Sequence, residues 1–159
     1  MMIGDYLTQF STSFIEVIQK MTGIAGEWEE VVPCLPTITE GMTVVSLLGL
    51  TGSSRGRVVM EMNFHTAHEL AQMMNGESLK PMDPMVFYSL TELCNIFSGK
   101  AITQINNGPE RPGLRLTPPN ILVGEKLQIF VEYANLRTAR VRWNNEFLYI
   151  HLCIERSKV

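Results

Sequence analysis

Two segments of the sequence carry the same helical frame, and together they indicate the fold. The first reads TSFIEVIQKMTG from Thr12 to Gly23, and the second reads YSLTELCNIFSG from Tyr88 to Gly99. Each contains a glutamate, an amide three positions later and a glycine seven positions later: Glu16, Gln19 and Gly23, then Glu92, Asn95 and Gly99. At about 3.6 residues per turn these positions share one face of a helix. We therefore predict a duplicated helix, although two unrelated amphipathic helices could share this pattern by chance.

The apolar residues of both segments lie on the opposite face, which predicts that one side packs and the other meets solvent or a partner. They are Leu7, Phe10, Phe14, Val17, Ile18 and Met21 in the first segment, and Val86, Leu90, Leu93, Cys94, Phe97 and Ala101 in the second. We expect the first helix over residues 5–22, ending at Gly23. The second is expected over residues 84–107, with Asp83 as N-cap and Pro84 in the first helical position.

The rest of the chain predicts strands and one short helix. Residues 43–50 and 57–63 favour a hairpin, the second strand alternating as if one face were buried, and residues 66–74 favour a helix. Strands are then expected over residues 126–133, 137–143 and 146–155, with Asn144 and Asn145 as the last hairpin turn. This order predicts one α+β domain over residues 1–159. Its two pseudo-symmetric halves, about 5–76 and 83–156, each consist of a long helix followed by antiparallel strands.

Composition limits the classes of function. The chain has 159 residues, 45% hydrophobic and 18% charged, which is typical of a globular domain with a real core. A net charge of −3 gives no electrostatic footprint for nucleic acid. No stretch is long and apolar enough to span a bilayer, and we expect no signal peptide, because no basic region precedes an apolar run near residue 1. Cys34, Cys94 and Cys153 are odd in number and scattered, which favours free thiols in a cytoplasmic protein.

The second segment resembles the CheC/CheX/FliY family of chemotaxis phosphatases, the CheX branch in particular. The family signature is an acidic residue or serine, three residues, Glu, two residues, Asn, and Pro twenty-three positions after the Asn. Glu92, Asn95 and Pro118 satisfy this spacing. The first position departs from it, because Tyr88 stands there and Ser89 comes one position late.

The resemblance implies a phosphatase that hydrolyses the aspartyl phosphate of a CheY-like response regulator. Asn95 would orient the attacking water and Glu92 would pair with the regulator's active-site lysine. Tyr88, Gly99 and Pro118 would face the partner. Mg²⁺ is expected in the regulator's active site, and no cofactor is expected on this chain. The alternative is a non-catalytic module that binds a response regulator or a flagellar switch component.

The first copy is expected to be inactive. Gln19 is one methylene longer than Asn95, which would move its amide by about 1.5 Å, and a misplacement of this size can cost on the order of 10²-fold in rate. The resemblance also implies a homodimer. The apolar segment 147–155 would be an aggregation hazard as a free sheet edge, so it is a candidate for pairing between subunits, although either half could supply the edge strand.

Histidines are the remaining candidates for chemistry. His65 and His68 have a spacing that can bind a metal, with Glu69 beside them, but no further ligand is evident, so we interpret them as the exposed start of a helix. His151 lies in a predicted strand, away from any visible nucleophile.

Overall fold

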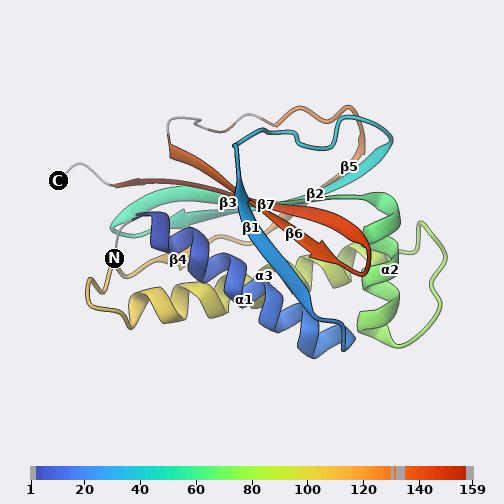
Figure 1. The fold of residues 1–159 in the computed structure, drawn as a ribbon, viewed down its shortest axis with the longest axis horizontal. Coiled ribbons are helices and arrows are strands. Elements are labelled where there is room, and N and C mark those ends of the chain that lie inside the picture. Colours follow the sequence, from blue (N-terminus) through green and yellow to red (C-terminus); the bar gives the residue numbers. More distant parts are fainter. Residues whose placement is uncertain (1–2, 130, 132–134, 157–159) are drawn as a thin grey trace.

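The computed structural model describes residues 3–129, 131 and 135–156. In chain order its elements are α1 (Ile3–Thr22), β1 (Gly26–Val31), β2 (Met42–Thr51), β3 (Ser54–Asn63), α2 (Phe64–Asn75), α3 (Pro84–Asn106), β4 (Arg115–Leu116), β5 (Asn120–Glu125), β6 (Leu136–Trp143) and β7 (Glu146–Arg156). Figure 1 shows one sheet, with α1 and α3 across the same face and α2 at one end. No helix in these ranges is long and apolar enough to span a bilayer.

The described strands form one antiparallel sheet whose order reflects the duplicated sequence. The order is β1-β6-β7-β3-β2, and both β4 and β5 pair with the outer edge of β2. With β5 included, the order is β1-β6-β7-β3-β2-β5. If β1, β2 and β3 are swapped with β5, β6 and β7 respectively, this order becomes its own reverse, as a two-fold repeat requires. The first strand of each half thus pairs with the second strand of the other half, and the two third strands meet in the centre. This topology confirms the predicted α+β fold with two pseudo-symmetric halves.

The main core lies between the sheet and the two long helices. The apolar stripes predicted for both helices are buried there, except that Met21 is half-buried, together with alternate residues of the central strands such as Met60 and Ile150. Phe14 of α1 meets Phe97 of α3 edge to face, with ring centroids 5.1 Å apart. Because α1 and α3 lie side by side on the sheet, their remaining faces point away from the core (Figure 1).

The opposite face of the sheet carries a second, smaller core, which the sequence pattern did not predict. The loop between β1 and β2 and the segment after β5 cross this face, and the cluster beneath them consists of Leu35, Val45, Val59, Ile129, Leu136 and Cys153 (Figure 1). The prediction of one buried face for residues 57–63 is therefore wrong, because positions 58–62 are all buried.

Two strand predictions also need correction. Segment 147–155 is no sheet edge, since residues 146–153 of β7 pair with β6 on one side and residues 149–156 pair with β3 on the other. Among the described residues, the sheet ends instead at β1 and at β4 and β5. The strand predicted over 126–133 is replaced by β5, which begins and ends earlier, and positions 130, 132 and 133 lie outside the described residues.

The last hairpin turn is where the sequence predicted it. Asn144 and Asn145 have φ angles of +49° and +61°, the left-handed pair that a two-residue turn between antiparallel strands requires. This turn brings the start of β7 to the side of α2.

Candidate functional site

The exposed side of α3 carries the candidate site. Asp83 caps the helix by accepting a hydrogen bond from the backbone N–H of Met85 at 2.9 Å, and Pro84 follows it. Burial of the apolar stripe then fixes the rotation of the helix. Residues at intervals of three and four consequently form an outward-facing strip, which we call the α3 strip: Met85, Tyr88, Glu92, Asn95 and Gly99.

Glu92 and Asn95 are the polar centre of the α3 strip. Both side chains are exposed, and within residues 3–129, 131 and 135–156 neither has a hydrogen-bond or ion-pair partner. A buried or paired carboxylate would have to break its contacts before binding anything else. Glu92 and Asn95 are therefore available together, one helical turn apart, to enter a single site on a partner.

Tyr88 occupies the strip position where the family signature has an acidic residue or serine. Its side chain is 68% exposed, so it faces any molecule that meets the strip. Ser89 cannot replace it, because Ser89 is buried and its hydroxyl donates to the carbonyl of Met85 at 2.7 Å. The same hydroxyl accepts from the amide of Asn75 at 2.7 Å, so Ser89 joins α3 to α2.

Gly99 closes the strip at its far end. A Cβ built on this residue would meet no atom within 4 Å, so nothing inside the described chain requires a glycine here. A glycine on this face could admit either another helix of the same chain or the backbone of a partner, and among the described residues no other helix comes close. Close approach of a partner remains.

The corresponding residues of α1 have a different environment. Glu16 forms an ion pair with Lys100 of α3, across the contact between the two helices. Gly23 is no strip residue; it ends α1 with φ +77°, and its N–H donates to the carbonyl of Gln19 at 2.8 Å. Gln19 itself is exposed. The first copy thus keeps an amide on the surface, but its carboxylate is engaged and its glycine has a structural use.

Pro118 lies on a different element from the strip. It is exposed in the segment between β4 and β5, next to Thr117. Thr117 binds the edge of β2 twice, through its hydroxyl, which accepts from the N–H of Gly49 at 2.7 Å, and through its own N–H, which donates to Gly49 at 2.9 Å. The position of Pro118 is thereby held at the sheet edge.

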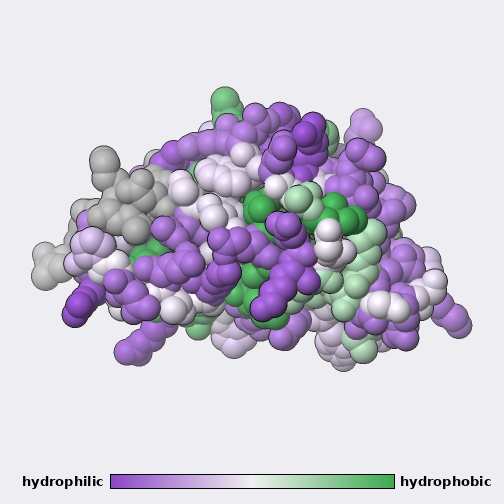
Figure 2. Space-filling model, turned by 60° about the horizontal axis from the view of Figure 1, so that its bottom comes forward, coloured by the Kyte–Doolittle hydropathy of each residue, from purple (hydrophilic) through white to green (hydrophobic). Residues whose placement is uncertain are grey.

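Figure 2 brings the underside of the molecule, with its helices, towards the reader. Hydrophilic residues cover most of this face, and hydrophobic residues gather near its centre and towards the α2 end. Met85, one turn before Tyr88 on α3, is 40% exposed, and Met82, just before the helix, is 60% exposed. A polar pair thus lies beside an apolar patch, an arrangement that suits a protein partner better than a small solute.

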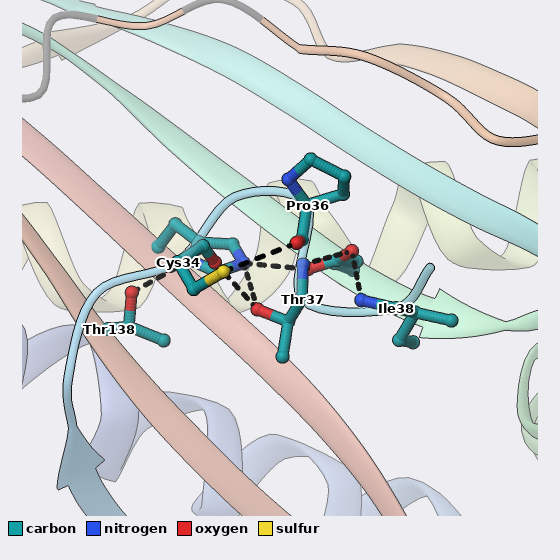
Figure 3. Close-up of polar contacts among 7 residues, drawn as sticks. Cys34, Pro36, Thr37, Ile38 and Thr138 are labelled. Carbon is teal, nitrogen blue, oxygen red and sulfur yellow. Dashed lines mark hydrogen bonds and ion pairs between the residues drawn. The ribbon is translucent and has the colours of Figure 1, made fainter. Parts of the chain in front are cut away.

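A buried polar network, which sequence reasoning missed, lies on the other face of the sheet (Figure 3). Glu61 of β3 and His151 of β7 are both fully buried, with Oε1 of the glutamate 2.8 Å from Nε2 of the histidine. Glu61 also accepts the backbone N–H groups of Thr37 and Ile38 at 2.9 Å. Nδ1 of His151 lies 2.8 Å from the hydroxyl of Thr138.

This network ties the β1–β2 loop to the sheet. Burial raises the pKa of Glu61, but the hydrogen bonds from His151, Ile38 and Thr37 outweigh it and leave the pKa below its ordinary value. The carboxylate is thus charged and fully satisfied, with no free lone pair directed at solvent. We assign the network to structure, and the α3 strip remains the site candidate.

Comparison with known families identifies the chain. A model of the family described as "Chemotaxis phosphatase CheX" matches residues 44–138. The chain belongs to this family. The matched region includes Glu92, Asn95 and Pro118 and excludes the first copy of the motif. A comparison with curated protein sequences gives no match.

Solved structures of CheX-type proteins share the fold over nearly the whole chain. The CheX protein of Vibrio vulnificus superposes with a TM-score of 0.82 at 18% identity, over 95% of this chain and 99% of that one. A complex of CheX with CheY, BeF3 and Mg²⁺ from Borrelia burgdorferi gives 0.77 at 24% identity, over 95% and 98%. FliY of Thermotoga maritima gives 0.71 at 14% identity, over 94% and 86%.

Proposed function

We propose that this chain is a protein phosphatase that hydrolyses the aspartyl phosphate of a CheY-like response regulator. The observation that carries the proposal is the α3 strip: in a member of the CheX family, a carboxylate and an amide that have no partner among the described residues face outwards one turn apart. A CheX relative forms a complex with CheY, which supports a regulator of that kind as the partner.

Asn95 is proposed to position the attacking water. Hydrolysis of an acyl phosphate needs a water in line with the bond that breaks, and most of the catalytic gain comes from position and electrostatics. An amide donates and accepts hydrogen bonds without exchanging a proton, so it can orient water throughout the reaction. Because Asn95 has no partner among the described residues, docking costs no internal hydrogen bond.

Glu92 is proposed to pair with the lysine of the regulator's active site. A charge-assisted hydrogen bond between carboxylate and ammonium is stronger than a neutral one, and it fixes how the two proteins align. Mg²⁺ belongs to the regulator in this scheme, and this chain contributes the carboxylate and the amide. Tyr88 and Gly99, on either side of the pair, would meet the regulator's surface, with Pro118 held nearby as a further contact.

The decay of the acyl phosphate on a purified, phosphorylated CheY-like regulator tests the proposal. Decay should become faster when this protein is added in catalytic amounts, and it should stay slow with the Asn95→Ala variant. A phosphorylated regulator that binds this chain and yet decays at its own rate would overturn the phosphatase assignment. That result would instead support the alternative, a non-catalytic module that binds a response regulator or a flagellar switch component.

The proposal includes a homodimer in the cytoplasm. Since β7 is internal, pairing between subunits would have to use an edge of the described sheet, which means β1 or the β4–β5 side. A dimer of that kind leaves the α3 strip of each subunit accessible, because the helices lie on the face of the sheet (Figure 1). Light scattering should then give twice the monomer mass of 17.9 kDa, and an unchanged monomer mass on concentration would exclude the dimer.

A further inference from the structure

Three side chains of the kinds that bind metals converge where the β6–β7 turn meets α2. His65 and Glu69 are one turn apart on α2, and Glu146 is the first residue of β7. Figure 1 shows the β6–β7 turn beside α2, at the end of the molecule farthest from both chain termini. Glu146 follows the left-handed turn at Asn144 and Asn145, which places it beside α2. In the sequence it comes 77 positions after Glu69.

The two distances from His65 match those around one ion. Nε2 of His65 lies 3.4 Å from Oε1 of Glu69 and 3.5 Å from Oε1 of Glu146, and all three ligand atoms are within 4.8 Å of one another. In a tetrahedral zinc site with bonds of about 2.0–2.2 Å, neighbouring ligand atoms are about 3.3–3.6 Å apart. Both distances from the histidine therefore equal an edge of such a tetrahedron without any movement of the backbone.

The second oxygen of each carboxylate is held by a residue outside the trio. The amide of Asn144 donates to Oε2 of Glu69 at 3.5 Å, and the hydroxyl of Thr66 lies 3.2 Å from Oε2 of Glu146, sharing its one proton between that oxygen and Oδ1 of Asn63 at 2.9 Å. Contacts of this kind orient ligands in metal sites and leave one oxygen of each carboxylate for the ion. The side chain of His65 is 67% exposed, so an ion could enter from solvent and keep water as a further ligand.

The charges also favour a cation. Two carboxylates face a single imidazole, so the group carries a negative charge whether or not the histidine is protonated. An imidazole among the ligands favours zinc and similar transition metals, whereas Mg²⁺ and Ca²⁺ prefer sites made of oxygen alone. We propose that His65, Glu69 and Glu146 form a site for a divalent transition-metal ion of the zinc class, which clamps the β6–β7 turn to α2.

This clamp is separate from the proposed phosphatase chemistry. Neither Glu92 nor Asn95 belongs to the group, and the ion is held by α2 and β7. Its expected effect is on stability, because an ion that binds only the folded chain shifts the folding equilibrium. The competing explanation is an ion pair, with protonated His65 shared between the two glutamates and no metal at all.

Titration of the full-length chain, free of any affinity tag, with ZnCl2 in a calorimeter tests the proposal. One ion should bind per chain, and His65→Ala and Glu146→Gln should each weaken binding at least about tenfold, since each removes one of three ligands. Glu77→Gln is the matched control, because Glu77 is exposed just after α2 and outside the trio, and it should bind zinc like the parent.

Thermal unfolding gives the second readout. Zinc should raise the Tm of the parent and of Glu77→Gln. It should raise the Tm of His65→Ala and Glu146→Gln less or not at all. Millimolar Mg²⁺ should not raise the Tm of the parent as zinc does. No binding by the parent, or parental binding in both ligand variants, would overturn the proposal in favour of the ion pair or of adventitious zinc at another side chain. Circular dichroism of each variant establishes that a loss of binding is not a loss of fold.

Discussion

The two long helices share one residue frame but present different surfaces. In α1 the glutamate of the frame, Glu16, is paired with Lys100, and the glycine ends the helix at Gly23. In α3 the corresponding Glu92 is unpaired among the described residues, and the helix continues past Gly99 to Asn106. The position that corresponds to Lys100 is Ile24, an apolar residue beyond the end of α1, and so the internal ion pair forms only once.

This difference shows how a duplicated element becomes specialised. The same packing face holds both helices on the sheet, so the fold keeps both copies. The outward face is free to diverge. In α1 its glutamate forms the ion pair with Lys100, and its glycine ends the helix. A glutamate that is already paired, such as Glu16, must lose that contact to bind a partner, whereas Glu92 and Asn95 of α3 have no contact of this kind to lose among the described residues.

Matched substitutions of the two amides are the strongest test of this comparison. Asn95→Ala should lower the rate of regulator dephosphorylation by on the order of 10²-fold, because the water is no longer positioned. Gln19→Ala should change the rate little, and both variants should keep their stability, since both residues are exposed on helices. Decay of the acyl phosphate measures both. A comparable loss in the two variants would mean that both faces work, and the comparison would fail.

Matched substitutions of the two glutamates should have a smaller effect. Glu92→Gln should weaken binding of the phosphorylated regulator by about 2 kcal/mol, or roughly thirtyfold in Kd, because it leaves the regulator's lysine without its partner. Glu16→Gln should leave binding unchanged and cost at most about 1 kcal/mol of stability, the usual range for an exposed ion pair. Calorimetric binding and urea unfolding distinguish the two. Weaker regulator binding by Glu16→Gln would assign a docking role to the first copy.

The elements of the fold were largely predictable, because they depend on local patterns. The apolar periods, the cap at Asp83 and the turn at Asn144 and Asn145 each act over a few residues, and each is found where it was expected. Strand pairing depends on contacts between distant residues. For this reason β7 was only a candidate for pairing between subunits in the sequence, whereas in the structure it lies inside the sheet.

The site was predictable only in part. Spacing identified Glu92 and Asn95 as neighbours, but Lys100 was no obvious partner of Glu16 until the helix packing was known. The pair of Glu61 and His151 is separated by 90 positions, and the alternation around Glu61 suggested a solvent face. One signal was present in the sequence, because both residues alternate with apolar neighbours in their strands. A polar residue in such a strand is buried when a second layer, here the β1–β2 loop, covers its face of the sheet.

The buried carboxylate at Glu61 sharpens the comparison by showing a glutamate used entirely for structure. Its pKa in the folded chain is below the ordinary value of 4.5, so its contribution to stability is present above that pH and is lost as the pH falls through the folded pKa. The free energy of unfolding should therefore decrease on acidification below about pH 4.5. Glu61→Gln should reduce stability at neutral pH and flatten this acid dependence.

Urea unfolding at several pH values measures that slope. Glu92→Gln is the control for Glu61→Gln, because the Glu92 side chain contacts no charged partner among the described residues, and it should keep the parental curve. If the free energy of unfolding of Glu61→Gln falls as steeply on acidification as that of the parent, other groups dominate the pH dependence.

Matched substitutions of the two glycines have the smallest expected effect, and the effects should have opposite signs. Gly99→Ala should stabilise the chain by about 0.5–1 kcal/mol, because glycine is unfavourable inside a helix and the added methyl group meets open space. Gly23→Ala should destabilise it by about 1 kcal/mol, since alanine is strained at φ +77°.

If Gly99 is small to admit the regulator's backbone, the more stable Gly99→Ala variant should also bind the regulator more weakly. Urea midpoints and regulator Kd, measured on the same two variants, separate these effects. A stabilised Gly99→Ala protein with parental affinity would remove Gly99 from the docking surface while leaving Glu92 and Asn95 as its centre.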